Sequence, residues 1–255
     1  MVDVPLLLLF QALLLPLVLF LTSFFARVRD RRPLAELGLA WPAGTLRSLI
    51  FGGALAGALL AAWRLVAGSL FEFEVRPVAA ELATPWLPLS LSGLALVLAG
   101  LLSSALLDEI IFRGYIFSTL REKFPWVHAA GLTNLLYLTF NATSPEAGAA
   151  ALINIFLLGL VLAGLRERTG SLAAGVAFQT VWNLTLGSLF SLRLSGFDFP
   201  RLEDVRLTGD PQLSGGDYGP EGGWLITGAL LLGLALIVAW VERGRSEAPA
   251  APAEA

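Results

Sequence analysis

The chain has 255 residues, of which 56% are hydrophobic and 15% are charged, and its formal net charge is −3 at pH 7. This composition leaves too few polar residues to cover a soluble globule of that length. Cysteine is absent, which excludes disulfides, thiolate metal sites and a cysteine nucleophile, and the single histidine, His128, excludes a site that needs two imidazoles from one chain. The small charge, spread over the connections, indicates no nucleic-acid partner.

Apolar runs with the length of membrane spans recur along the whole chain. A helix needs roughly 20 residues to cross a hydrocarbon core of ~30 Å. Spanning segments must satisfy their backbone internally, and the alternating pattern of a barrel is absent, so the sequence predicts an all-α fold, a polytopic transmembrane helical bundle with about seven spans. The seven runs lie at 4–25, 46–69, 86–107, 125–142, 147–165, 170–190 and 222–241.

The remaining segments complete the predicted organisation. The first run lacks a basic n-region and a clear cleavage site, so we expect a retained helix rather than a signal peptide. Residues 1–245 form a single membrane-embedded helical domain, and the Ala/Pro/Glu-rich tail 246–255 is expected to be disordered. The connection 191–221 is rich in Gly and Asp and is predicted to be irregular. The sequence shows no internal repeat and no second, soluble domain.

The basic residues of the connections predict how the bundle is oriented. Eleven of the seventeen Lys and Arg residues fall on one side of the predicted membrane: Arg27, Arg29, Arg31, Arg32, Arg47, Arg121, Lys123, Arg166, Arg168, Arg243 and Arg245. The connections of the other side hold four arginines among nine acidic residues. With seven spans, the N-terminus lies outside and the C-terminus in the cytoplasm of an integral plasma-membrane protein, and the lipid bilayer is its first partner.

Two arginines, Arg64 and Arg113, lie within or at the edge of apolar runs, where a charge is costly unless it is paired or hydrated. Glu109 precedes Arg113 by four residues, so the two share a helix face and are expected to form an ion pair. Asp108 is rotated by about 100° from Glu109 and can point elsewhere into the bundle. Taken alone, this pattern indicates a neutralised charge cluster that closes a helix.

The segment 108–117 resembles the first motif of the CPBP family, the CAAX prenyl protease and bacteriocin-processing group of intramembrane metalloproteases. That motif has two acidic residues, three spacers and Arg-Gly. The segment 137–141 is similar to the family's aromatic-x-x-x-His element. The segment 167–172, which leads through an apolar stretch to Trp182 and Asn183, is similar to its last motif. The resemblance covers a core of about residues 90–190 in the same order and spacing.

The resemblance implies a helical bundle that holds a metal ion and a water molecule within the membrane, with an acidic residue as general base. Asp108 stands where the family has its Glu base, and Asn141 and Gln179 stand where it has histidines, while Asn183 is unchanged. Amide oxygens bind zinc far more weakly than imidazole. We therefore expect no metal or other cofactor at these positions, and zinc only if the family site persists in atypical form. His128, ~20 Å of helix rise before Asn141, is expected to be an interfacial or packing residue.

Three classes of function remain open. The resemblance and its departures favour a catalytically degenerate family member with a scaffolding or regulatory role, whose partner is a membrane-associated peptide or protein. The alternative is an active intramembrane endopeptidase that cleaves membrane-associated, including prenylated, peptides, with Asp108, Glu109 and Arg113 at the family's catalytic positions. The second alternative is a transport or channel component, with Arg64 and the carboxylates along a polar path. In the purely structural interpretation, polar groups such as Gln179 only join helices through hydrogen bonds.

Overall fold

The computed structural model describes residues 4–40, 43–76, 91–141, 146–199 and 203–246. Of residues 4–5, 91–94 and 140–141 only the backbone is described. The predicted disordered tail beyond Ser246 lies outside the described residues, as does the predicted beginning of the third span.

The described chain is an all-α bundle, and the predicted fold class is confirmed. Each predicted apolar run contains a helix, and a further helix continues the third run toward the fourth. The helices are α1 (Val4–Phe24), α2 (Thr45–Leu70), α3 (Leu91–Asp108), α4 (Phe117–Arg121), α5 (Trp126–Asn141), α6 (Ala149–Thr169), α7 (Ala173–Asn183), α8 (Pro211–Ser214) and α9 (Trp224–Ser246). Two short 3₁₀ turns, Gly216–Tyr218 and Pro220–Gly222, precede α9.

Three π-helical segments continue these helices without a break: η1 (Phe25–Arg29), η2 (Glu109–Ile116) and η3 (Leu184–Leu189). The segment η2 joins α3 to α4, so one long helix runs from Leu91 to Arg121. Its hydrogen bonds run from residue i to i+5, a pattern that is rare in proteins and frequent at functional sites.

Five segments of the described chain are long and apolar enough to cross a membrane: Leu6–Arg29, Thr45–Leu70, Ala95–Arg121, Ala149–Thr169 and Trp224–Ser246. The other two predicted spans are shorter: α5 has 16 residues, and α7 with its continuation η3 runs from Ala173 to Leu189. The residues of α7 are buried around most of its circumference, which is typical of a helix enclosed by others. The five long apolar segments are typical of an integral membrane protein.

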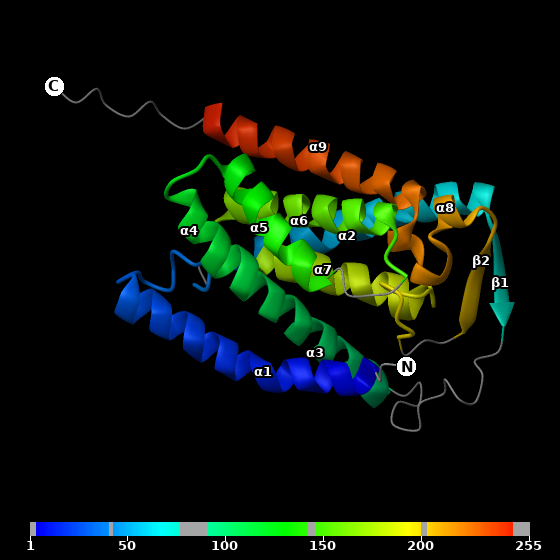
Figure 1. Cartoon of the computed structure of the whole chain (residues 1–255), viewed down its shortest axis with the longest axis horizontal. Helices are drawn as coiled ribbons and strands as arrows, with labels where there is room; N and C mark the ends of the chain where they lie inside the picture. Colours follow the sequence, from blue (N-terminus) through cyan, green and yellow to red (C-terminus); the bar gives the residue numbers. More distant parts are fainter. Residues whose placement is uncertain (1–3, 41–42, 77–90, 142–145, 200–202, 247–255) are drawn as a thin grey trace.

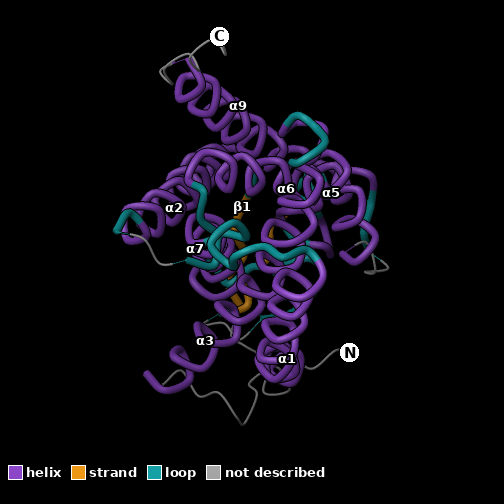
Figure 2. Tube along the Cα trace, turned by 90° about the vertical axis from the view of Figure 1, so that its left-hand side faces the viewer, coloured by secondary structure: helices purple, strands orange, loops and turns teal. Residues whose placement is uncertain are grey.

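The helices run roughly alongside one another (Figure 1). Helix α7 packs against α2, α9 packs against α6 and α2, and α5 packs against α6. Helices α1 and α3 pair with each other below this group (Figure 2). The main apolar core lies between α2, α6, α7 and α9, where side chains such as Leu60, Leu162, Phe178 and Ile226 are fully buried.

The basic connections gather at one end of the bundle, as predicted. The end of α1, α4 and the C-terminal end of α9 lie together at the left of Figure 1. Ion pairs join these segments: Arg32 pairs with Glu122, and both Arg121 and Arg245 pair with Glu167, at 2.8 and 3.2 Å. We call this the basic end.

The opposite end carries a structured cap, and the prediction of an irregular 191–221 connection is wrong for much of its length. Strand β2 (Asp204–Thr208) pairs antiparallel with β1 (Glu72–Arg76), so that Val75 lies opposite Val205. The connection orders because it carries apolar side chains that become buried, among them Leu192, Leu194 and Tyr218.

Candidate functional site

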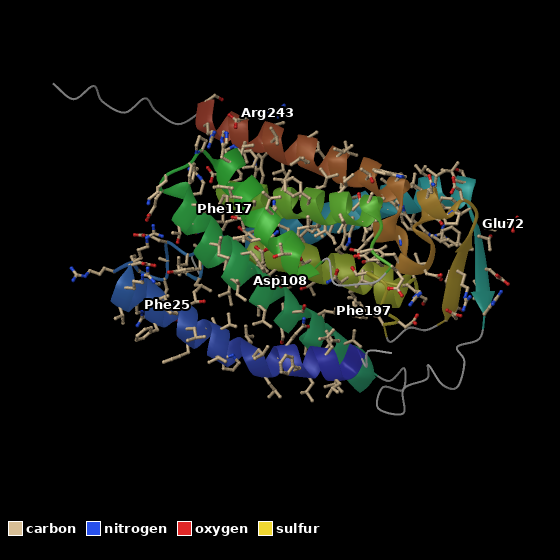
Figure 3. All side chains as sticks on the ribbon, in the orientation of Figure 1. Phe25, Glu72, Asp108, Phe117, Phe197 and Arg243 are labelled. Carbon is tan, nitrogen blue, oxygen red and sulfur yellow. The ribbon has the colours of Figure 1, made fainter. Side chains whose placement is uncertain are left out.

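The long helix that includes η2 brings its charged residues to the middle of the bundle. Figure 3 shows Asp108 there, between Arg243 at the basic end and Glu72 at the cap. Glu109 and Arg113 are both 0% exposed, and the Arg113 Nε lies 3.7 Å from a Glu109 carboxylate oxygen. The predicted ion pair is therefore present and fully removed from solvent.

Groups from two further helices complete the surroundings of Arg113. Its Nη2 donates to the side-chain oxygen of Asn134 on α5, at 3.3 Å, and to the carbonyl of Gly159 on α6, at 3.4 Å. Its guanidinium carbon lies 4.5 Å from the ring centroid of Tyr137, which is a cation–π contact. Arg113 thus joins η2, α5 and α6 at one point.

Helix α7 supplies the other partner of Glu109. The side-chain nitrogen of Gln179, which is 5% exposed, donates to a Glu109 oxygen at 3.0 Å. Glu109 also lies against Gly175, one turn earlier on α7, where a Cβ would collide with its carboxylate. Gln179 therefore lies beside Glu109, although 70 positions separate the two in sequence, as the resemblance of the two motifs implied.

Asp108 lies beside this group and has a partner of its own. The hydroxyl of Tyr137 donates to an Asp108 oxygen at 3.2 Å, and the Tyr137 ring packs edge-on against Phe112, with 4.9 Å between centroids. Asp108 and Glu109 therefore point to different partners, as their rotation along the helix predicted. We refer to Asp108, Glu109, Arg113, Asn134, Tyr137 and Gln179 as the polar cluster.

The polar cluster does not satisfy all of its own polar atoms. One Glu109 oxygen, Nε and Nη1 of Arg113, and the side-chain nitrogen of Asn134 are buried without a hydrogen-bond partner among the described residues. Buried polar atoms of this kind are uncommon in folded proteins, and each of them calls for an explanation. This group of atoms is the strongest structural reason to treat the polar cluster as a site rather than as part of the core.

The sequence identified five of the six members of the polar cluster, if Tyr137 is counted from its motif, and it did not identify the groups of α5 and α6 that contact Arg113. Asn134, Gly159 and Gly175 were missed. A signal for them exists, because a glycine within an apolar span often marks a close helix contact, and an asparagine there usually faces another helix.

The remaining predicted residues lie elsewhere. Asn183 is the last residue of α7 and is half-buried, and the side chain of Asn141 lies outside the described residues. His128 is exposed at the beginning of α5. The guanidinium of Arg64 stacks on the Phe73 ring, 3.6 Å from its centroid, which joins α2 to β1 and gives Arg64 no place beside the carboxylates.

The described donors do not fit the zinc ion that the family resemblance implies. No three His, Cys, Asp or Glu residues in the described ranges are grouped closely enough to hold a metal ion. Glu109 already neutralises a cation, and the nitrogen of Gln179, rather than its oxygen, faces Glu109. Zinc in proteins is bound by imidazole, thiolate and carboxylate groups, usually three or four together. Of the carboxylates in the polar cluster, only Asp108 is left as a possible zinc ligand, and Asn141 would have to supply a further one.

Comparison with known families places this site in context. Residues 90–185 match the family model described as type II CAAX prenyl endopeptidase Rce1-like. No curated protein and no solved structure matches the chain. The matched range contains α3, η2, α5, α6 and α7, which carry every member of the polar cluster. The resemblance predicted from the sequence motifs is thus confirmed over residues 90–185, and in this range the chain is similar to the type II CAAX prenyl endopeptidases.

Proposed function

We propose that this protein is a catalytically degenerate relative of the CAAX prenyl endopeptidases, which keeps the helical bundle and uses it for a scaffolding or regulatory task on a membrane-associated peptide or protein. The observation that carries this proposal is the hydrogen bond from the Gln179 amide to Glu109. By the resemblance, the side chain that donates this hydrogen bond to the carboxylate stands where the family has a metal-binding imidazole.

The acidic residues are also poorly placed to act as a general base. A base must reach the water whose proton it removes, directly or through one further water. Glu109 is engaged by Arg113 and Gln179, and Asp108 accepts the Tyr137 hydroxyl. Asp108 is also one methylene shorter than the family's glutamate, and a misplacement of ~1 Å can cost about a hundredfold in rate.

A zinc titration of purified protein tests the degenerate site. The wild type should bind little zinc. The double variant Asn141→His with Gln179→His should bind zinc tightly if α5 and α7 converge at Asp108 and Asn183 as the family motifs imply, because tight binding needs three or four ligands in fixed geometry. The matched control is Leu135→His with Gln179→His, since Leu135 lies on the same helix but is 54% exposed. Stoichiometric zinc in the wild type would contradict the proposal.

A peptidase assay separates the proposal from its alternative, an active endopeptidase with an atypical site. The purified wild type is incubated with a prenylated peptide, and the products are identified by mass spectrometry. We expect no cleavage above that of an Asp108→Asn variant. Cleavage that depends on Asp108 would overturn the proposal, whereas Asp108→Glu added to the two histidines tests whether the longer base restores activity.

A further inference from the structure

The connection between η1 and α2 folds back against the bundle instead of passing over its surface. Residues 33–39, which we call the plug, form a tight turn in which the amide of Gly38 donates to the carbonyl of Ala35 at 3.0 Å. Pro33, Ala35 and Glu36 are exposed, but Leu37 is 0% exposed. The plug therefore inserts one leucine side chain into the basic end.

Three elements of the bundle hold the plug. The Nη2 of Arg166 on α6 donates to the Glu36 carbonyl at 2.6 Å, and the amide of Leu172, just before α7, donates to the Gly38 carbonyl at 3.2 Å. The Leu37 carbonyl lies against Gly114 of η2. Gly38 has φ +76°, and a Cβ there would lie 2.9 Å from the Arg166 Nε, so only glycine fits this position without strain.

The plug lies beside a pocket of about 320 Å³ at the basic end. Arg32, Glu36, Phe117, Ser118, Arg121, Glu122, Arg166 and Glu167 line it. Arg166 lies between the plug and the polar cluster, because its guanidinium donates to the Glu36 carbonyl and also interacts electrostatically with Glu109. Phe117, which is 2% exposed, lines the pocket from the beginning of α4.

Two hydrogen bonds join the plug to the rest of the described chain, from Arg166 and Leu172, and one of its side chains, that of Leu37, is fully buried. Segments with few buried apolar contacts open at a small fraction of the global free energy of unfolding. We propose that the plug is a gate: when Leu37 and Glu36 leave their places, the pocket at the basic end becomes continuous with the polar cluster. This inference does not depend on whether the polar cluster is catalytic.

Thiol accessibility in the full-length protein tests the gate, and the chain is suited to it because it contains no cysteine. Gln179→Cys places a reporter thiol in the polar cluster, and its reaction rate with a small charged methanethiosulfonate is measured in detergent. Adding Leu37→Ala or Arg166→Gln should accelerate the reaction about tenfold or more, because each removes one of the main restraints on the plug. The matched control Leu46→Ala, a leucine that is 65% exposed at the same end, should leave the rate unchanged.

A second reporter distinguishes opening of the gate from loss of the fold. Ala56→Cys places a thiol at a fully buried position of α2, in the main core. Its slow reaction should be the same with and without Leu37→Ala. If both reporters accelerate together, residues 33–39 are simply part of the global fold and the gate is refuted. The gate is also refuted if adding Leu37→Ala or Arg166→Gln leaves the reaction rate of Gln179→Cys unchanged.

Discussion

Removing one member of the Glu109–Arg113 pair should destabilise the protein severely. Both residues are 0% exposed, so solvent cannot take over from the missing partner. In Glu109→Gln the Arg113 guanidinium loses its nearest carboxylate and retains the side-chain oxygen of Asn134, the carbonyl of Gly159 and the face of the Tyr137 ring, with the charge of Asp108 as the remaining electrostatic partner. Leaving a buried charge uncompensated costs ~3–5 kcal/mol. Arg113→Ala should cost a similar amount, since it strands the Glu109 carboxylate.

Thermal unfolding in detergent measures this effect. For a chain of this size, 1 kcal/mol corresponds to roughly 2–4 °C in Tm, so each single variant should lose at least ~6 °C. The double variant Glu109→Gln with Arg113→Met should lose less than the sum of the single losses, because neither member of the pair remains charged without the other. The matched control is Glu74→Gln, which breaks a pair whose side chains are 45–49% exposed and should cost ~1 kcal/mol or less.

The predicted loss of stability is refuted if Glu109→Gln and Arg113→Ala both unfold within about 2 °C of the wild type. Water would then reach the pair in solution, and the pair would not be buried between η2, α5 and α6. A double variant with the full additive loss would show instead that the two residues act independently, contrary to the ion pair at 3.7 Å.

Two further predictions concern the ends of the bundle. A cysteine at Asp217, whose side chain is 91% exposed in the cap, should react with a membrane-impermeant reagent in intact cells, whereas a cysteine at Arg29 should not, and the reverse pattern would show the opposite orientation. Burial raises the pKa of Glu221 above its ordinary value of 4.5, although hydrogen bonds from Ser195 and Trp182 partly oppose the shift. The folded state then retains a proton that the unfolded chain releases, so the Tm should fall as pH rises above 4.5 through the folded pKa, and equal pH dependence in Glu221→Gln would contradict this.

Sequence reasoning succeeded where the signal is local. Apolar runs of span length gave the helix positions, and the spacing of four residues gave the Glu109–Arg113 pair, because both follow from helix geometry. The proximity of Gln179 to Glu109 came only through the family resemblance, since no periodic pattern connects residues 70 positions apart. The fully buried position of Leu37 was not predicted, because a single leucine in a polar connection carries no periodicity.

The π-helical segment η2 shifts the register of the long helix, so that the side chains after it point in other directions than in a continuous α-helix. A π turn contains more residues than the 3.6 of an α turn, so side chains beyond Ile116 face directions rotated by about 100° per extra residue from those of a continuous α-helix. A one-residue deletion within 109–116 could be absorbed by a return to α geometry. Phe117 and Arg121 at the basic end would then turn about the helix axis relative to Asp108. A gap at this place in an alignment of relatives would therefore mark a change in the relative orientation of the side chains on either side of η2.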